Sequence, residues 1–363
     1  MDVYQSLERL TEIPGPSGME ERIANAVGEL WEPYVDTMSQ DRVGNLFAVR
    51  RGAGEGERRR LLIAAHMDEI GLMVSRLEQY PKDSDNAAGY LRLSPVGGVD
   101  VRHLFGQQVV VHGERDLPGL VGALPPHMLP DDRQSKAYNY DELMVDVGLP
   151  LAELEELVRV GDFISFHQPL RRLLNDRVSG KSLDNRASVA AVAVALKHLS
   201  GRRHDWDIIA VATTQEETRL LGAFTSAFSQ QPDAALAVDV TFGKGPGAKD
   251  RNVFELDDGP ALGIGPNVHP GIFKKLQEAA DALEMTVHTD PHARYSGTDA
   301  YGLQIAREGI PTGLVGIPLR YMHTMVETVA IPDIKRTGRL LAEFVASLDA
   351  DFLEQLAARM MEE

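Results

Sequence analysis

The feature that most constrains this chain is an alternation of apolar, strand-like runs with longer helical patterns from residue 178 onward. The strand-like runs lie at 207–214, 233–241 and 312–319, and the helical patterns lie at 187–199, 270–283 and 334–348. Strands that alternate with helices of about 10–15 residues are typical of an α/β sheet. An earlier stretch at 60–74 contains a near-continuous apolar run that ends at a polar cluster, as a buried strand would. The alternation therefore predicts an α/β domain.

A segment with a different residue pattern interrupts this alternation of strands and helices. The stretch "GYLRLSPVGGVDVRHLFGQQVVVHGERDLPGLVGAL" consists of short alternating strands punctuated by glycine and proline. Residues 151–166 then supply one helix and a closing strand. The sequence therefore predicts a small β-rich domain inserted at 73–167, within a larger domain formed by residues 1–72 and 168–363.

The charge and the lack of cysteine narrow the possible partners. The formal net charge of -17 disfavours nucleic acid and anionic membranes, because phosphate binding requires clustered Lys and Arg. Without cysteine, any metal site must use His, Asp and Glu, which suit zinc, cobalt or manganese. No run reaches the roughly 18 apolar residues of a membrane helix, and no signal peptide is recognisable. We therefore expect a cytoplasmic protein.

Histidines and carboxylates stand at the ends of strand-like runs or at the start of a helix. The positions are His66 and Asp68, Asp184, Glu216 and Glu217, Asp239, and His323. In open α/β sheets the ligand crevice lies beyond the carboxyl ends of the strands. We therefore expect these side chains to converge on one site.

Each of these residues also has a simpler, structural interpretation. Asp184 suits a helix N-cap, and Asp239 suits a turn. Glu216 and Glu217 suit an exposed helix start, where the helix dipole contributes up to about 1 kcal/mol. A single histidine after a strand is more often a hydrogen-bonded residue than a ligand.

The set as a whole favours a metal site. Two histidines and three carboxylates complete a shell for two zinc-like ions if one carboxylate bridges them. His66 and Asp68 would share one face of an extended strand, so Asp68 could accept the second ring N–H of His66. One carboxylate of the Glu216–Glu217 pair is then left over for a general base. The spacing alone leaves open which glutamate has which role.

The order of motifs identifies a family. The chain resembles the tetrahedral aminopeptidases, which are cytoplasmic, co-catalytic metallopeptidases. The similarity runs nearly end to end and is carried by "PGPSGMEE", "AAHMDEIGLMV", "GKSLDNRAS", "QEET", "VDVT" and "IPLRYMHTMVETV". The resemblance implies a mixed-sheet, zinc-exopeptidase-like catalytic domain interrupted by a barrel-like or PDZ-like domain. It also implies an aminopeptidase that releases N-terminal residues from short peptides.

The resemblance assigns the metal ligands. It implies two divalent ions per subunit, zinc or cobalt with manganese as an alternative, and no other cofactor. His66 and Asp239 correspond to terminal ligands of one ion, and Glu217 and His323 correspond to ligands of the other. Asp184 corresponds to the bridging carboxylate.

The resemblance also assigns the remaining acids and the assembly. Glu216 corresponds to the general base that acts on a metal-activated water, and Asp68 corresponds to the acid behind His66. The inserted segment at 73–167 corresponds to a dimerisation domain, and the family's dimers assemble into a tetrahedral homododecamer.

The chain departs from the family pattern at four positions. Arg219 and Leu221 stand where the family usually has glycine and arginine, and Ser296 and Tyr301 stand where glycines are common. The presumed ligands are unaffected, so these changes bear on specificity.

Two alternative functions stay open from the sequence. One is a cellulase-like glycoside hydrolase, which would use two carboxylates but leaves the histidine pair unexplained. The other is a non-catalytic scaffold derived from a peptidase.

Overall fold

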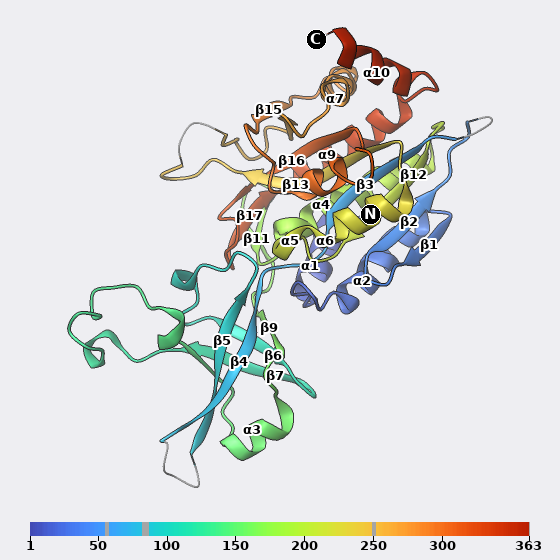
Figure 1. Ribbon diagram of the computed structural model, residues 1–363. Coiled ribbons are helices and arrows are strands. Elements are labelled where there is room, and N and C mark those ends of the chain that lie inside the picture. Colours follow the sequence, from blue (N-terminus) through green and yellow to red (C-terminus); the bar gives the residue numbers. More distant parts are fainter. Residues whose placement is uncertain (55–57, 82–86, 249–251, 363) are drawn as a thin grey trace.

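A mixed sheet of eleven strands forms the larger part of the molecule in the computed structural model, which describes residues 1–54, 58–81, 87–248 and 252–362 (Figure 1). Its strand order is β1-β2-β12-β3-β13-β16-β17-β11-β10, and β14 and β15 extend from β16. The strands are β1 (Thr37–Gln40), β2 (Leu46–Arg50), β3 (Arg60–His66), β10 (Arg171–Arg172), β11 (Arg177–Gly180), β12 (Asp207–Thr213), β13 (Ala234–Phe242), β14 (Ala261–Ile264), β15 (His288–Pro291), β16 (Thr312–Arg320) and β17 (Glu327–Ala330). The four central strands, β12, β3, β13 and β16, run parallel.

Helices cover both faces of this sheet. They are α1 (Val3–Glu12), α2 (Glu21–Trp31), α4 (Leu183–Ser200), α5 (Glu216–Arg219), α6 (Leu221–Gln230), α7 (Pro270–Ala282), α8 (Asp299–Gln304), α9 (Ile331–Ala346) and α10 (Phe352–Glu362), and short 3-10 turns lie at Glu32–Tyr34, Val101–His103, Pro126–Met128 and Tyr140–Glu142. Among the helices of the described ranges, none combines the length and the apolar character needed to cross a membrane.

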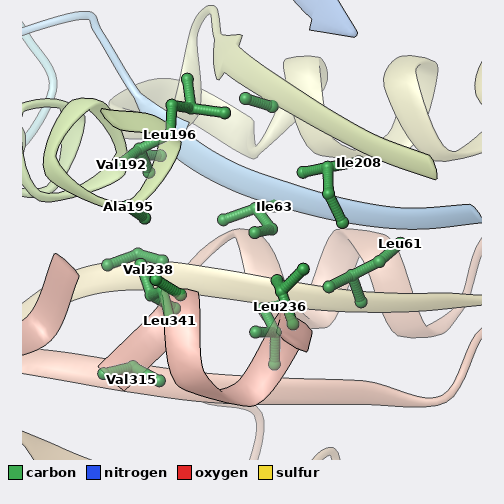
Figure 2. Close-up of a cluster of buried hydrophobic side chains, with 14 of the residues drawn as sticks. Leu61, Ile63, Val192, Ala195, Leu196, Ile208, Leu236, Val238, Val315 and Leu341 are labelled. Atoms are coloured by element: carbon green, nitrogen blue, oxygen red, sulfur yellow. The ribbon is translucent and has the colours of Figure 1, made fainter. Parts of the chain in front are cut away.

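The core divides into two layers because successive strand residues point to opposite faces. Leu61 and Ile63 of β3 pack with Leu196 of α4 on one face (Figure 2), whereas Leu62 packs with Ala223 of α6 on the other. The helix α4 packs against the sheet and against α9, which explains why nearly all of its residues are buried and most of them are apolar. Each fully buried Leu or Ile contributes about 1.5–3 kcal/mol to folding.

The segment between β3 and β10 forms a separate closed barrel of six antiparallel strands (Figure 1). The elements are β4 (Gly71–Tyr80), β5 (Ala88–Val96), β6 (Gln108–His112), β7 (Asp116–Gly122), β8 (Met144–Asp146), the helix α3 (Leu151–Leu157) and β9 (Phe163–Phe166). In β7 exposed and buried residues alternate, as a barrel with a filled interior requires. The predicted fold class, an α/β domain with a mixed sheet interrupted by a β-rich barrel, is confirmed. The dimerisation role of the barrel and the domain boundaries at 72/73 and 167/168 stay predictions.

The stretch at 60–74 forms two strands, one before and one after its polar cluster. β3 ends at His66, and β4 starts at Gly71 as the first strand of the barrel. A Cβ atom at Gly71 would lie 3.0 Å from Cβ of Pro16 and 3.1 Å from the carbonyl oxygen of Ile164, so the chain passes closely between the two units. Asp68 therefore lies beyond the strand end rather than in a strand register with His66.

Candidate metal centre

All seven residues singled out in the sequence meet at one edge of the sheet. His66 ends β3, Glu216 and Glu217 start α5 directly after β12, and Asp239 lies in β13 three residues before its end. Asp68 follows the end of β3, Asp184 lies in the first turn of α4, and His323 lies in the turn after β16. The carboxyl ends of the parallel strands thus supply most of the site, as expected for an α/β sheet.

Asp184 lies between the two histidines. One carboxylate oxygen, Oδ1, is 3.1 Å from Nε2 of His66, and the other, Oδ2, is 3.5 Å from Nε2 of His323. Glu217 flanks His323, with 3.4 Å between Oε2 and Nε2. Asp239 flanks His66, with 3.8 Å between Oδ1 and Nε2. Asp184 therefore presents one oxygen to each half of the cluster, which is the arrangement of a bridging ligand.

Two overlapping groups within this cluster have the spacing of a metal site. The ligand atoms of His66, Asp184 and Glu217 lie within 4.8 Å of one another, and so do those of His66, Glu216 and Asp239. Imidazole nitrogens and carboxylate oxygens are the donors that zinc and similar ions accept when thiolates are absent. The donor set thus fits divalent metal ions.

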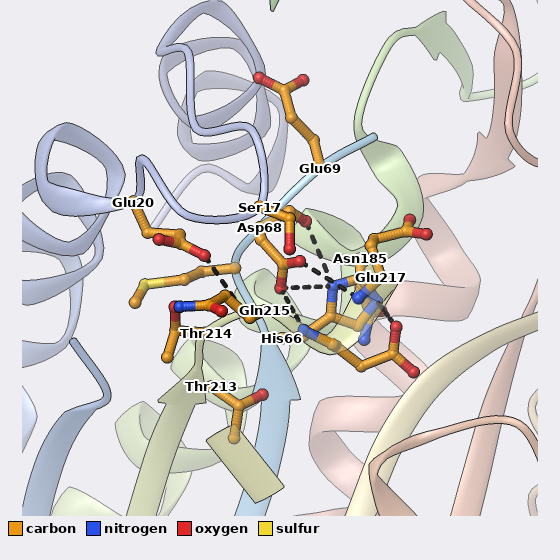
Figure 3. Close-up of polar contacts among 12 residues, drawn as sticks. Ser17, Glu20, His66, Asp68, Glu69, Asn185, Thr213, Thr214, Gln215 and Glu217 are labelled. Atoms are coloured by element: carbon orange, nitrogen blue, oxygen red, sulfur yellow. Dashed lines mark hydrogen bonds and ion pairs between the residues drawn. The ribbon is translucent and has the colours of Figure 1, made fainter. Parts of the chain in front are cut away.

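Asp68 joins the end of β3 to the start of α5. Nδ1–H of His66 donates to the backbone carbonyl of Asp68 at 3.2 Å, and Oδ1 of Asp68 lies 3.5 Å from the same nitrogen. The Asp68 carboxylate accepts the backbone N–H groups of Glu216 at 3.0 Å and of Glu217 at 3.2 Å (Figure 3). The His66 ring is therefore held with Nε2 facing the cluster, as a ligating imidazole requires.

The backbone at Gln215 makes this contact with Asp68 possible. Gln215 has a φ of 53° and so turns the chain sharply from β12 into α5. As a result, the first two N–H groups of α5 both point to Asp68. A non-glycine residue in the left-handed region is uncommon and costs about 1–3 kcal/mol, and such residues often occur at functional sites. His323 itself has a φ of 61°.

Glu327 is a second carboxylate that holds two parts of the cluster together, and the sequence did not single it out. Its Oε2 accepts the backbone N–H of Asp184 at 3.0 Å, and its Oε1 accepts that of His323 at 2.9 Å. Glu327 is buried, and burial together with the nearby charge of Asp184 raises its pKa well above the usual range. The available signal was a glutamate that begins an apolar strand four residues after His323.

The electrostatics of the cluster favour a bound cation. Burial, followed by the charge of Asp184, raises the pKa of Glu217 to about 8. Burial also raises the pKa of Asp239 to about 8 and that of Glu216 well above its usual value. Burial would raise the pKa of Asp184 too, but hydrogen bonds with His323 and His66 hold it below its ordinary range. A divalent ion would stabilise the ionised carboxylates at this position.

A glycine pair from the barrel packs against the cluster, and the sequence did not reveal this contact. A Cβ atom at Gly98 would lie 2.5 Å from Nδ1 of His323, and one at Gly97 would lie 3.3 Å from Cβ of Glu217. Gly97 also has a φ of 77°, which a side chain would strain. The loop after β5 therefore needs glycine in order to approach the cluster, and it fixes the position of the His323 ring.

Replacing Gly98 with Ala is expected to displace His323 and to weaken metal binding by about 10–100-fold, the usual effect of disturbing the surroundings of a ligand. Metal content after dialysis, measured by elemental analysis, checks this result. Gly122→Ala is the matched control, because Gly122 also lies in the barrel and a Cβ there meets nothing within 4 Å. Equal metal content in the two variants would contradict the expectation that the Gly98–His323 contact supports metal binding.

A cavity of about 770 Å³ opens beside the cluster. Three of the four positions that depart from the family pattern, Arg219, Ser296 and Tyr301, line it. The ring of Tyr301 lies 5.5 Å from that of Tyr295 and 6.4 Å from that of Phe224, measured between centroids. Tyr301 thus adds a ring beside Tyr295 and Phe224, and the three rings form an aromatic part of the cavity wall.

The chain is similar to known proteins along most of its length. The model of the M42 glutamyl aminopeptidase family matches residues 44–340. The chain is 35% identical over 350 residues to a lysyl aminopeptidase of Pyrococcus furiosus. The aligned region covers 95% of this chain and 97% of the relative. It also resembles the structure of an aminopeptidase from the archaeon Desulfurococcus kamchatkensis, with a TM-score of 0.87 and 34% identity. This match covers 98% of this chain and 97% of the other. A third match is the TET1 peptidase of Pyrococcus horikoshii, which is described as assembling into a tetrahedron or a large octahedral shell. Its TM-score is 0.82 at 30% identity, and the match covers 96% of this chain and 100% of the other.

Proposed function

The chain belongs to the M42 glutamyl aminopeptidase family, whose members hydrolyse peptides, and we propose that it releases N-terminal amino acids from short peptides with the aid of two divalent metal ions. The observation that carries the two-metal proposal is the position of Asp184, with one oxygen facing His66 and the other facing His323. A carboxylate placed in this way, with a second acid beside each histidine, suits a pair of ions better than a single ion.

In this proposal the five ligands divide between the two ions. His66 and Asp239 would hold one ion, Glu217 and His323 would hold the other, and Asp184 would supply an oxygen to each. Nitrogen and oxygen donors without sulfur favour zinc or cobalt, with manganese as an alternative. When bound, two such ions lower the pKa of a water molecule and polarise the scissile carbonyl.

Glu216 is the general base in this proposal. Its Oε2 lies 3.8 Å from Nε2 of His66, and its side chain is only 9% exposed. It accepts a proton from the attacking water and returns it to the nitrogen of the leaving amine. The raised pKa of this buried carboxylate suits a group that must hold a proton briefly and then release it. Asp68 is a positioning residue, because it orients the His66 ring and the backbone of Glu216.

A panel of aminoacyl-nitroanilides tests this function. The purified protein is stripped with a chelator, reloaded with zinc, cobalt or manganese, and assayed for nitroaniline release. Activity that disappears on stripping and returns on reloading supports the proposal. A β-glucan is assayed in parallel, because the cellulase-like alternative predicts metal-independent release of reducing sugar. Hydrolysis of the glucan without hydrolysis of any nitroanilide would overturn the peptidase proposal.

We further propose that the chain assembles through its barrel into dimers and then into a tetrahedral dodecamer. The support is the similarity to the TET1 peptidase, for which a dodecamer is described. Light scattering is expected to give a mass near twelve times that of the 39.8-kDa chain. Short peptides are the proposed substrates, and the cytoplasmic location stays a prediction.

A further inference from the structure

We propose that Asp290 selects substrates whose N-terminal residue is basic, lysine or arginine, by binding the charged end of that side chain. The inference rests on the aminopeptidase function proposed above and adds a substrate class to it. Outside the candidate metal-centre residues, Asp290 is the one acidic side chain among the described residues that line the active-site cavity.

Asp290 belongs to a buried part of the cavity lining. Asp290, Thr241 and Leu314 line the cavity and are 4%, 7% and 3% exposed. Other lining residues, such as Arg219 and Tyr295, are exposed. An aminopeptidase must enclose the first residue of its substrate and let the rest of the peptide extend outward. We therefore place the N-terminal side chain against the buried part of the lining, which contains Asp290.

The sheet places Asp290 at a suitable distance from the metal centre. Asp239 and Thr241 are two residues apart on β13, so their side chains lie on the same face about 6.6 Å apart. Oγ1 of Thr241 donates a hydrogen bond of 2.8 Å to Oδ2 of Asp290. A lysine side chain has a four-carbon stem, which is comparable in length to this separation. A substrate held at the metal centre can thus bring its ammonium group to Asp290.

Two glycines keep the floor of the cavity open along this path. Gly316 on β16 pairs with Asp239, and Gly263 on β14 pairs with Asp290. A Cβ atom at Gly316 would lie 3.0 Å from Cβ of Thr241. The strands β13 and β15 are not neighbours in the sheet, so the Thr241–Asp290 hydrogen bond links the β14–β15 edge directly to β13. Gly263 and Gly316, which both line the cavity, leave room beside this link.

One oxygen of Asp290 is available to a ligand. Thr241 bonds to Oδ2, and Nε2 of His292 lies 3.4 Å from that same oxygen. Among the described parts of the chain, no hydrogen bond reaches Oδ1. A buried carboxylate with an unused oxygen gains a charge-assisted hydrogen bond from an ammonium or guanidinium group, and it disfavours an acidic side chain. Arg219 is the one Lys or Arg among the described lining residues, and within the described parts of the chain it forms no ion pair with Asp290.

The test compares Asp290→Asn with wild-type holoenzyme on lysyl, arginyl, leucyl and glutamyl nitroanilides. Wild-type enzyme is expected to prefer the two basic substrates by at least about tenfold in kcat/KM, and the variant is expected to lose about 100-fold in the lysine-to-leucine ratio. Asparagine keeps the shape of the side chain and the bond to Thr241, so only the charge is removed. Asp258→Asn, an exposed carboxylate before the same strand edge, is the matched control and should leave the ratio unchanged.

Binding gives an independent readout. Calorimetry with L-lysine and with L-norleucine, which has the same length without the ammonium group, is expected to show tighter binding of lysine to the wild type and no difference for Asp290→Asn. A preference for leucine or glutamate, or an equal loss on all four substrates in the variant, would overturn the inference and leave the peptidase proposal intact. If no nitroanilide is hydrolysed with any metal, the proposed function fails, and the lysine–norleucine comparison still decides the role of Asp290.

Discussion

Glu216→Gln is expected to lower kcat by about 10²–10⁴-fold and to leave the metal content at the wild-type level. Glutamine has nearly the same shape as glutamate but cannot accept a proton from water. The hydrogen bond from the backbone of Glu216 to Asp68 does not involve the side chain, so the start of α5 and the neighbouring Glu217 should stay in place. Steady-state kinetics on a reactive nitroanilide and elemental analysis of the same preparation measure the two quantities.

Glu217→Gln is the matched control, because it changes the adjacent residue in the same way. This variant is expected to lose metal along with activity, since Glu217 lies 3.4 Å from His323 and is a proposed ligand. If the two variants behaved alike, with both losing metal or both retaining full activity, the division of roles between the two glutamates would be wrong.

Asp184→Asn is expected to weaken the binding of both metal ions by more than about 100-fold, which exceeds the usual effect of changing a residue behind a ligand. The reason is the position of Asp184, whose two oxygens face different histidines, so a single substitution disturbs both halves of the cluster. Metal titration followed by calorimetry measures the affinity directly.

Thermal unfolding provides a second measurement for Asp184→Asn. A ligand at 100 times its Kd stabilises a folded protein by about 2.7 kcal/mol, so adding metal should raise the Tm of the wild type and leave that of the variant nearly unchanged. Asp239→Asn serves as the comparison, because Asp239 is a proposed ligand of one ion only. Two tightly bound ions in Asp184→Asn would rule out the bridging role.

Much of the fold could be predicted because its signals are local. Strands at 207–213, 234–242 and 312–320 follow the predicted apolar runs closely, and the parallel arrangement brings their polar ends together. This arrangement is also why His66, Asp239 and the glutamate pair lie near one another. The family resemblance then added the individual roles, which stay predictions until the variants are measured.

The rest of the site depends on contacts between distant parts of the chain. Nothing near Gly98 in the sequence indicates that a barrel loop lies against His323, because this contact arises only when the two units pack together. Glu327 was missed for a similar reason, since its two partners are backbone N–H groups of Asp184 and His323 rather than charged side chains. The start of the barrel strand β4 at Gly71 was not predicted, because the apolar residues before and after the polar cluster belong to two different cores.

The closed barrel also has a consequence for how the chain folds. His66 and Asp184 are separated by 118 residues, and most of the intervening chain belongs to the barrel. Leu72 in its first strand pairs with Ile164 in its last, so a closed barrel holds its entry and exit side by side. The effective loop between the two residues then shrinks to the short connections on either side, which lowers the entropy cost of joining them by about 1 kcal/mol. A substitution that destabilises the barrel interior should therefore slow the approach of His66 to Asp184, although neither residue lies in the barrel.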